Sequence, residues 1–292
     1  MTNIAMEATS RHASEDAANA CEEELLQMEA LLFARTYLYE LFSRLVGGTP
    51  DWELLDIVLS ETTQDVLEEF SDASDELEAF ASFLSSLRGA GRSDLLDAAK
   101  DEHTRIFIGP AALPASPYES PYTGSHDTAL FQENTLKVRN AYRAAGLAPR
   151  RVQAIPDDHI AMMLAFMASM ARRSRAAFFT GNDLSLGEAL EIQRAFLQEH
   201  MGGWLDVLAE SVRNSKAGRT GVLYPQLLEA VAALAKADVQ FLTEAAYWTS
   251  GQSALTRREG SPELAEAEKQ LVRLQRMSPL GIADFEVIEI QD

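Results

Sequence analysis

Two carboxylates stand directly before an imidazole at Asp157, Asp158 and His159. Such a group can polarise water or coordinate a divalent cation, so an acid–base or metal site is one interpretation. The other is structural, because an aspartate just after Pro156 can accept backbone N–H bonds at a helix start, where its charge also favours the helix dipole. Adjacent helical residues diverge by about 100°, so the three side chains do not all converge on one small ligand. Capping therefore accounts for at least one carboxylate without catalysis.

A second acidic and imidazole pair, Glu102 and His103, could complete a metal site with His159. A Glu-His pair in mid-helix is more often a solvated face beside a partly buried histidine. The chain has no His-Glu-x-x-His, Walker, Gly-x-Gly-x-x-Gly or Gly-x-Ser-x-Gly motif. We therefore predict no catalytic residue, no metal and no cofactor. The alternative that stays open is an all-helical metal-dependent hydrolase using Asp158 and His159.

The most unusual stretch of the chain is a proline-rich loop over residues 109–127. Four of the ten prolines fall within it, and each fixes φ near about −65° and lacks an N–H donor. The loop is therefore expected to be stiff and extended. Flexible linkers are usually polar, whereas this loop and the residues before it are rich in apolar and aromatic side chains. These side chains predict that the loop packs against, or lines, another part of the protein; they are Ile106, Phe107, Ile108, Leu113, Tyr118 and Tyr122.

Composition limits the class of partner and the compartment. The formal net charge of −20 disfavours nucleic acid and anionic lipid and favours basic partners. Cys21 is the single cysteine, so the chain cannot form an internal disulfide. No run approaches the roughly 20 apolar residues that span a bilayer, and the polar N-terminus does not resemble an export signal. The sequence therefore predicts a cytoplasmic protein without stable membrane insertion.

The elements that must position these residues are helices. Apolar residues recur at helical spacing, no βαβ pattern is present, and only 285–290 alternates like a strand. The sequence predicts an all-α, single-domain bundle of about nine to eleven helices. The expected segments are a disordered leader over 1–21, the helical domain over 22–255, and a C-terminal helix and tail over 256–292. The predicted helices run from near Glu22 to Gly47, through a short pair after Pro50, from Leu77 to Leu87, from an N-cap at Ser93 into Phe107, over 128–145, from Asp157 to near Gly181, over 185–211 with a kink at Gly202 and Gly203, over 222–249 and over 261–277.

Three blocks of this chain resemble the TorD/DmsD family of redox-enzyme maturation chaperones. The first reads Arg-Ile-Phe-Ile-Gly-Pro over 105–110 and Pro-Tyr-Glu-Ser-Pro-Tyr over 117–122. The second is Pro-Asp-Asp-His-Ile over 156–160, followed by Leu-Ala-Phe-Met over 164–167, and a weaker third runs from His200 to Trp204 and then Tyr224. The resemblance spans roughly residues 30 to 250. Related sequences often carry tryptophan at the place of Tyr118 and a hydrophobic residue at the place of Pro121.

The resemblance implies a cytoplasmic chaperone for a molybdenum-cofactor oxidoreductase. Such a protein binds the twin-arginine signal peptide, the apoprotein, or both, and assists cofactor loading before export. A scaffold for assembly of a cytosolic redox-enzyme subunit is a further alternative. The implied partners are the signal peptide and the apoprotein, with no nucleic acid, and the sequence also leaves a homodimer open.

A twin-arginine signal joins two guanidinium groups to an apolar segment, so its receptor needs carboxylates beside an apolar groove. The first two blocks supply both kinds of side chain. The predicted peptide site uses Phe107, Leu113, Tyr118 and Tyr122 for the apolar part, Glu119, Asp157 and Asp158 for the arginines, and His159 to orient the loop.

Overall fold

The computed structural model describes residues 2–89, 91–123, 128–150, 155–251, 255–277 and 285–288. Across these residues the chain forms twelve α-helices and one small sheet, which confirms the all-α prediction with a slightly higher helix count than expected. The helices are α1 (Thr2–Gly47), α2 (Trp52–Val58), α3 (Glu61–Glu68), α4 (Asp75–Leu87), α5 (Arg92–His103), α6 (Thr128–Ala144), α7 (Ile160–Thr180), α8 (Asp183–Phe196), α9 (Trp204–Asn214), α10 (Lys216–Arg219), α11 (Tyr224–Gly251) and α12 (Ala265–Arg276).

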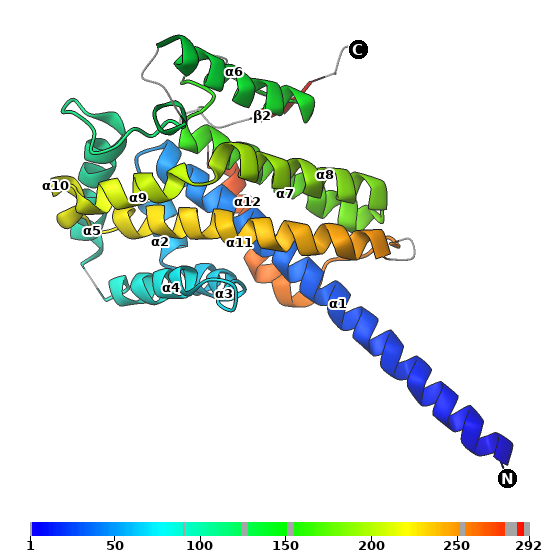
Figure 1. Ribbon diagram of the computed structural model, residues 1–292. Coiled ribbons are helices and arrows are strands. Elements are labelled where there is room, and N and C mark those ends of the chain that lie inside the picture. Colours follow the sequence, from blue (N-terminus) through cyan, green and yellow to red (C-terminus); the bar gives the residue numbers. More distant parts are fainter. Residues whose placement is uncertain are drawn as a thin grey trace.

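The long helices α1, α7, α8 and α11 lie side by side and enclose the core (Figure 1). α7 is the central element, because apolar residues cover nearly all of its first three turns and almost every one of them is buried. A helix that is hydrophobic all round must be covered on every side, and α1 and α8 supply most of that cover. The predicted apolar face of Ile160, Met163, Met167 and Met170 is therefore core.

The short helices begin where their sequences supply a capping side chain. Asp51 accepts from the backbone N–H of Leu54 at the start of α2, and Ser60 accepts from Thr63 at the start of α3. Ser74 caps α4 in the same way. These contacts satisfy amide groups that have no partner inside the helix.

Three helix starts differ from the prediction. α1 begins at Thr2 rather than near Glu22, and its first turns project away from the other helices (Figure 1). α5 begins at Arg92 with Gly91 as its N-cap rather than Ser93. α7 begins at Ile160, and its N-cap is His159 rather than Asp157. In the last case the imidazole Nδ1 accepts the helix amide, and the aspartates are used for contacts to other elements.

The predicted break at Gly202 and Gly203 is present. α8 ends in a π-helical turn over Leu197–Met201, and α9 starts at Trp204. Gly203 has φ +81°, a left-handed conformation that favours glycine. The break between the π-helical turn and α9 therefore depends on these two glycines.

The C-terminal part of the described chain packs onto the same core. α12 lies against α1 and buries Leu271 and Leu274 completely. β2 (Phe285–Val287) pairs antiparallel with β1 (Leu147–Pro149), with Leu147 opposite Val287. Among the helices of the described residues, none combines the length and the apolar character needed to cross a membrane.

Candidate functional site

The proline loop lies directly against the start of α7. Tyr118 and His159 form an isolated antiparallel bridge, and the backbone N–H of Glu119 donates to the Asp158 carbonyl at 3.1 Å. The N–H of Ile160 donates to the Pro117 carbonyl at 2.9 Å. Two sequence blocks with the whole of α6 between them therefore form one backbone-bonded unit.

Asp158 holds this unit from inside. Its side chain is fully buried, and it accepts hydrogen bonds from the Ser120 N–H at 3.2 Å, from the Ser120 hydroxyl and from the Thr135 hydroxyl at 3.0 Å. Ser120 belongs to the loop and Thr135 to α6. The carboxylate therefore ties the loop and α6 to the N-terminus of α7.

Asp157 makes the second tie to α6. Its Oδ2 accepts from Arg139 Nε at 2.7 Å and Nη2 at 2.6 Å, and its carbonyl accepts from the Tyr142 hydroxyl at 2.8 Å. Burial, together with the charges of Asp157, Asp158 and Glu119, raises the pKa of Tyr142 well above its usual range, so the hydroxyl stays protonated and can donate. Asp157 thus already has a guanidinium partner within the chain.

His159 is a structural cap with an aromatic neighbour. Its Nδ1 accepts from the Ala161 N–H at 3.1 Å, and its ring meets the edge of Tyr118 with centroids 5.0 Å apart. Burial, with a smaller contribution from His103, lowers the pKa of His159 from 6.5 to about 4. The imidazole is therefore neutral near pH 7, the form in which Nδ1 can accept a hydrogen bond.

The other end of the loop contacts the third sequence block. Glu119 is buried, with Oε2 placed 3.4 Å from His200 Nδ1. Tyr122 stacks on Trp204 with centroids 5.4 Å apart, and its hydroxyl donates to the Ser116 carbonyl. His200 and Trp204 were absent from the predicted peptide site, although their block carries the family resemblance that could have pointed to them.

The two remaining predicted residues are Phe107 and Leu113. Phe107 packs against His103 and Tyr224, with ring centroids 5.2 and 5.6 Å away, and Leu113 is half-buried. A cleft of about 560 Å³ opens between residues 104–114 and 215–220, but Phe107 and Leu113 do not line it. The structure thus gathers Tyr118, Glu119, Tyr122, Asp157, Asp158 and His159, whereas Phe107 packs against His103 and Tyr224 instead.

The three acidic residues predicted to meet arginines are all turned inward. Asp157, Asp158 and Glu119 have side chains no more than about a twentieth exposed. A buried carboxylate needs donors or a counter-charge, and for Asp157 and Asp158 the loop and α6 provide them. They do not form the exposed row of carboxylates that was expected beside an apolar groove. Their position assigns them to holding the loop.

The Glu102 and His103 pair is also inside the protein rather than on a solvated face. Glu102 Oε2 accepts from the N–H groups of Val222 and Leu223 at 3.0 and 2.9 Å, which positions the start of α11. Burial raises the pKa of Glu102 and lowers that of His103. No group of three or more His, Cys, Asp and Glu side chains within the described ranges is arranged to hold a metal ion.

Sequence comparisons relate this chain to known proteins. The family model described as nitrate reductase delta subunit matches residues 64–210. The Tat proofreading chaperone DmsD of Salmonella typhimurium is 35% identical over 71 residues, which are 24% of this chain and only 34% of DmsD. The chaperone protein TorD of Shewanella oneidensis is 24% identical over 212 residues, covering 72% of this chain and 91% of TorD. No solved structure matches the chain. Since the family model spans half of its length, this chain belongs to the nitrate reductase delta subunit family, the family of TorD/DmsD-type chaperones.

Proposed function

We propose that this protein is a cytoplasmic chaperone that binds the twin-arginine signal peptide of a molybdenum-cofactor oxidoreductase and its apoprotein, and assists cofactor loading before export. Its relatives named Tat proofreading chaperone and chaperone protein support this function. The observation that carries it is the docking of the proline loop on α7 through Tyr118, Ser120, Asp158 and His159. The loop is thereby held in one shape beside the α8–α9 junction.

The loop can contribute to peptide binding through its aromatic side chains. Tyr118 and Tyr122 are half-buried, so each presents part of a ring at the surface while the rest packs on His159 or Trp204. Rigid aromatic rings of this kind contribute strongly to interfaces, because little side-chain entropy is lost on binding. His159 packs directly on the Tyr118 ring, and Asp158 fixes the loop between the two tyrosines through Ser120.

Calorimetric titration of a synthetic twin-arginine signal peptide into the full chain tests the proposal. The wild-type chain should bind it, and Tyr118→Ala should weaken binding by about tenfold, as for an interface anchor. Leu184→Ala is the matched control, because Leu184 is 80% exposed on α8 and is not part of the loop unit. Absence of wild-type binding, or equal affinities for all three proteins, would contradict the proposal.

Cofactor loading is tested separately from peptide binding. The molybdenum content of the client enzyme should fall when the chaperone is removed and return when it is supplied. A pull-down with signal-deleted client distinguishes the chaperone from a scaffold, since a scaffold keeps its partner without the signal. Restored loading that does not depend on the signal would favour the scaffold instead.

A further inference from the structure

A groove between α9 and α11 combines an apolar cleft with unneutralised carboxylates. It is relevant because Asp157 and Asp158 already have partners inside the protein and Glu119 is buried, so arginines of a partner need exposed acceptors elsewhere. The π turn with α9 forms one side of the groove and the middle of α11 forms the other, and Glu76 of α4 adds to the lining at one end. Helices α9 and α11 run antiparallel, so the groove follows their common axis.

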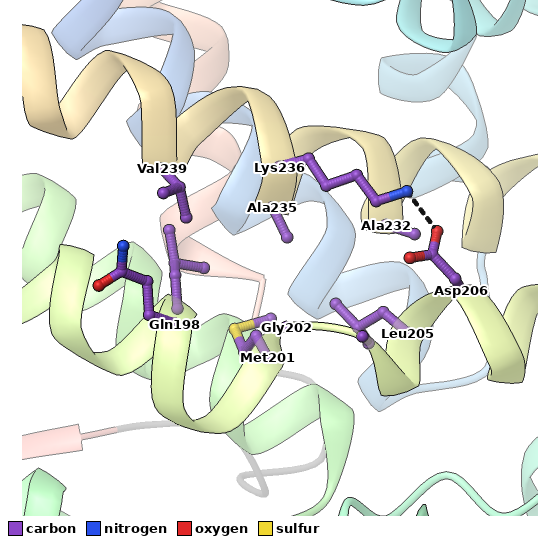
Figure 2. Close-up of a pocket in the computed structure, with 11 residues that line it drawn as sticks. Gln198, Met201, Gly202, Leu205, Asp206, Ala232, Ala235, Lys236 and Val239 are labelled. Atoms are coloured by element: carbon purple, nitrogen blue, oxygen red, sulfur yellow. Dashed lines mark hydrogen bonds and ion pairs between the residues drawn. The ribbon is translucent and has the colours of Figure 1, made fainter.

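The first half of the groove is apolar and encloses about 380 Å³ (Figure 2). Ala235 and Val239 of α11 face Met201 and Leu205 across it. Gly202 and Gly203, which have no side chains, also line this half, and a Cβ added to Gly203 would point into open space. This half suits short stretches of aliphatic side chain.

The second half of the groove is acidic and encloses about 550 Å³. Four acidic residues line it against two basic ones, so the formal charge is two minus four, or −2; they are Glu76, Asp206, Glu210 and Glu229, with Arg213 and Lys236. Arg213 pairs with Glu229 and Lys236 pairs with Asp206. Neither Glu76 nor Glu210 forms an ion pair with a described residue. Glu76 accepts a hydrogen bond from the Ser74 hydroxyl at 2.9 Å, and hydrogen bonds from its own backbone N–H and from Ser74, with a smaller contribution from the charge of Lys236, lower the pKa of Glu76.

The two halves are continuous. Asp206, Ala232 and Lys236 line both of them. At this junction Lys236 Nζ lies 2.6 Å from Asp206 Oδ1, with the two side chains 65% and 47% exposed (Figure 2). The lysine therefore crosses the groove at the point where its character changes from apolar to acidic.

We propose that this groove takes a peptide segment that carries two adjacent guanidinium groups next to an apolar run. The inference rests on the proposed function and names the surface that reads the signal. The apolar run lies against Ala235, Leu205 and Val239, and the guanidinium groups lie against Glu210, Glu76 and Asp206. The net charge of −2 matches two arginines.

In the unbound protein, Lys236 pairs with Asp206 at the position proposed for one of the two arginines. An incoming guanidinium can bind a carboxylate through two parallel N–H bonds, whereas an ammonium binds as a compact point charge. Arginine therefore displaces Lys236 from Asp206, and the exposed lysine moves into solvent. The displacement reduces affinity, because the chain must give up its own ion pair first.

The test measures the affinity of a synthetic twin-arginine peptide for single variants of exposed side chains. Glu210→Gln should weaken binding about fivefold, the effect of losing one exposed charge pair. Lys236→Met should strengthen binding about fivefold, because it frees Asp206. Glu244→Gln is the matched control, because Glu244 is an exposed glutamate like Glu210 but lies on α11 outside the groove. The affinity of this variant should stay within about twofold of wild type.

A second peptide in which both arginines are replaced by glutamine identifies the contact. The gain from Lys236→Met and the loss from Glu210→Gln should both disappear with it. Ala235→Leu, which fills the apolar half, should weaken the binding of both peptides.

If the wild-type chain binds the signal peptide and the groove variants do not change its affinity, the groove assignment is wrong while the chaperone function stands. If the wild-type chain binds no signal peptide but binds an unrelated peptide with two arginines and an apolar run, and does so through Glu210, the proposed function fails and the groove assignment stands.

Discussion

The Asp158 carboxylate accepts hydrogen bonds from both the backbone N–H and the hydroxyl of Ser120, and it does so with no exposed surface of its own. This pair joins the proline loop to α7 although 38 positions separate the two residues. Because the carboxylate is buried, the contact is made inside the protein. Any effect of Asp158 on a ligand must therefore pass through the loop.

The first prediction concerns this contact. Asp158→Ala should lower the free energy of unfolding by about 1–3 kcal/mol, because it leaves the Ser120 and Thr135 donors without their acceptor. Chemical denaturation measures the loss, and limited proteolysis should show faster cleavage within residues 109–123. Ser120→Ala should cost less, and the double variant should cost less than the sum. A variant as stable and as protease-resistant as wild type would contradict the tethering role.

The second prediction concerns pH and His159. Its pKa is about 4 in the folded protein against 6.5 for the free side chain. Between these two pH values the imidazole is protonated in the unfolded chain and neutral in the folded chain. The contribution of His159 to the free energy of unfolding is therefore fully present above pH 6.5 and is lost as the pH falls toward 4, by up to about 3 kcal/mol. His159→Asn keeps an acceptor for the Ala161 N–H and removes the titration.

Urea denaturation of wild type and His159→Asn at a series of pH values between 7.5 and 4 measures this difference. The two proteins should differ little at the upper end, and the variant should lose less stability on acidification. Carboxylates and His103 titrate in both proteins, so only the difference between the two curves reports His159. Parallel curves would show that His159 is not the group responsible.

Much of this arrangement could be predicted from the sequence. The prolines and aromatic residues indicated a stiff loop that packs, the Gly202–Gly203 pair marked the break before α9, and the meeting of the loop with the α7 start is present in the structure. These features depend on local properties of the chain, such as a fixed φ or a missing side chain.

The direction of the carboxylates could not be predicted in the same way. Asp157 and Asp158 turn inward because Arg139 and Thr135 of α6 and Ser120 of the loop reach them, and a residue type does not reveal which donors the fold will bring near. The α9–α11 groove could not be predicted from the sequence for a similar reason. Glu210 and Lys236 lie on different helices, and only antiparallel packing places them along one groove.

The third prediction concerns an ion pair in the centre of the bundle. Arg35 of α1 pairs with Asp238 of α11, and both side chains are fully buried. Gln193 and Tyr39 complete the network, at 2.6 Å from Arg35 Nη2 and from Asp238 Oδ2 respectively. Arg35→Met should cost about 3–5 kcal/mol, because it leaves a buried carboxylate without its counter-charge.

The matching variant, Asp238→Leu, should cost a similar amount. The double variant Arg35→Met with Asp238→Leu should lose much less than the two single costs together, since an apolar pair of similar volume replaces a desolvated ion pair. Denaturant midpoints with constant m-values measure all three. Simple additivity would show that the two residues do not stabilise the bundle as a pair.

The last prediction decides whether the C-terminal segment unfolds with the bundle or separately, as the predicted boundary at residues 255 and 256 implies. Leu274 of α12 is fully buried against the core, so Leu274→Ala should cost about 2–5 kcal/mol. All three tryptophans of the chain, Trp52, Trp204 and Trp248, precede the boundary. Trp52 adjoins Glu53, which pairs with Arg273 of α12, so the measurement uses a chain with Trp52→Phe and Trp248→Phe, in which the buried Trp204 of α9 reports the body. If α12 is part of one cooperative unit, the tryptophan transition should shift to lower denaturant together with the loss of helical circular dichroism.

Val272→Ala, which changes a 41% exposed side chain of the same helix, should leave both transitions nearly unchanged. A tryptophan transition that stays in place while part of the helical signal is lost early would establish the boundary instead.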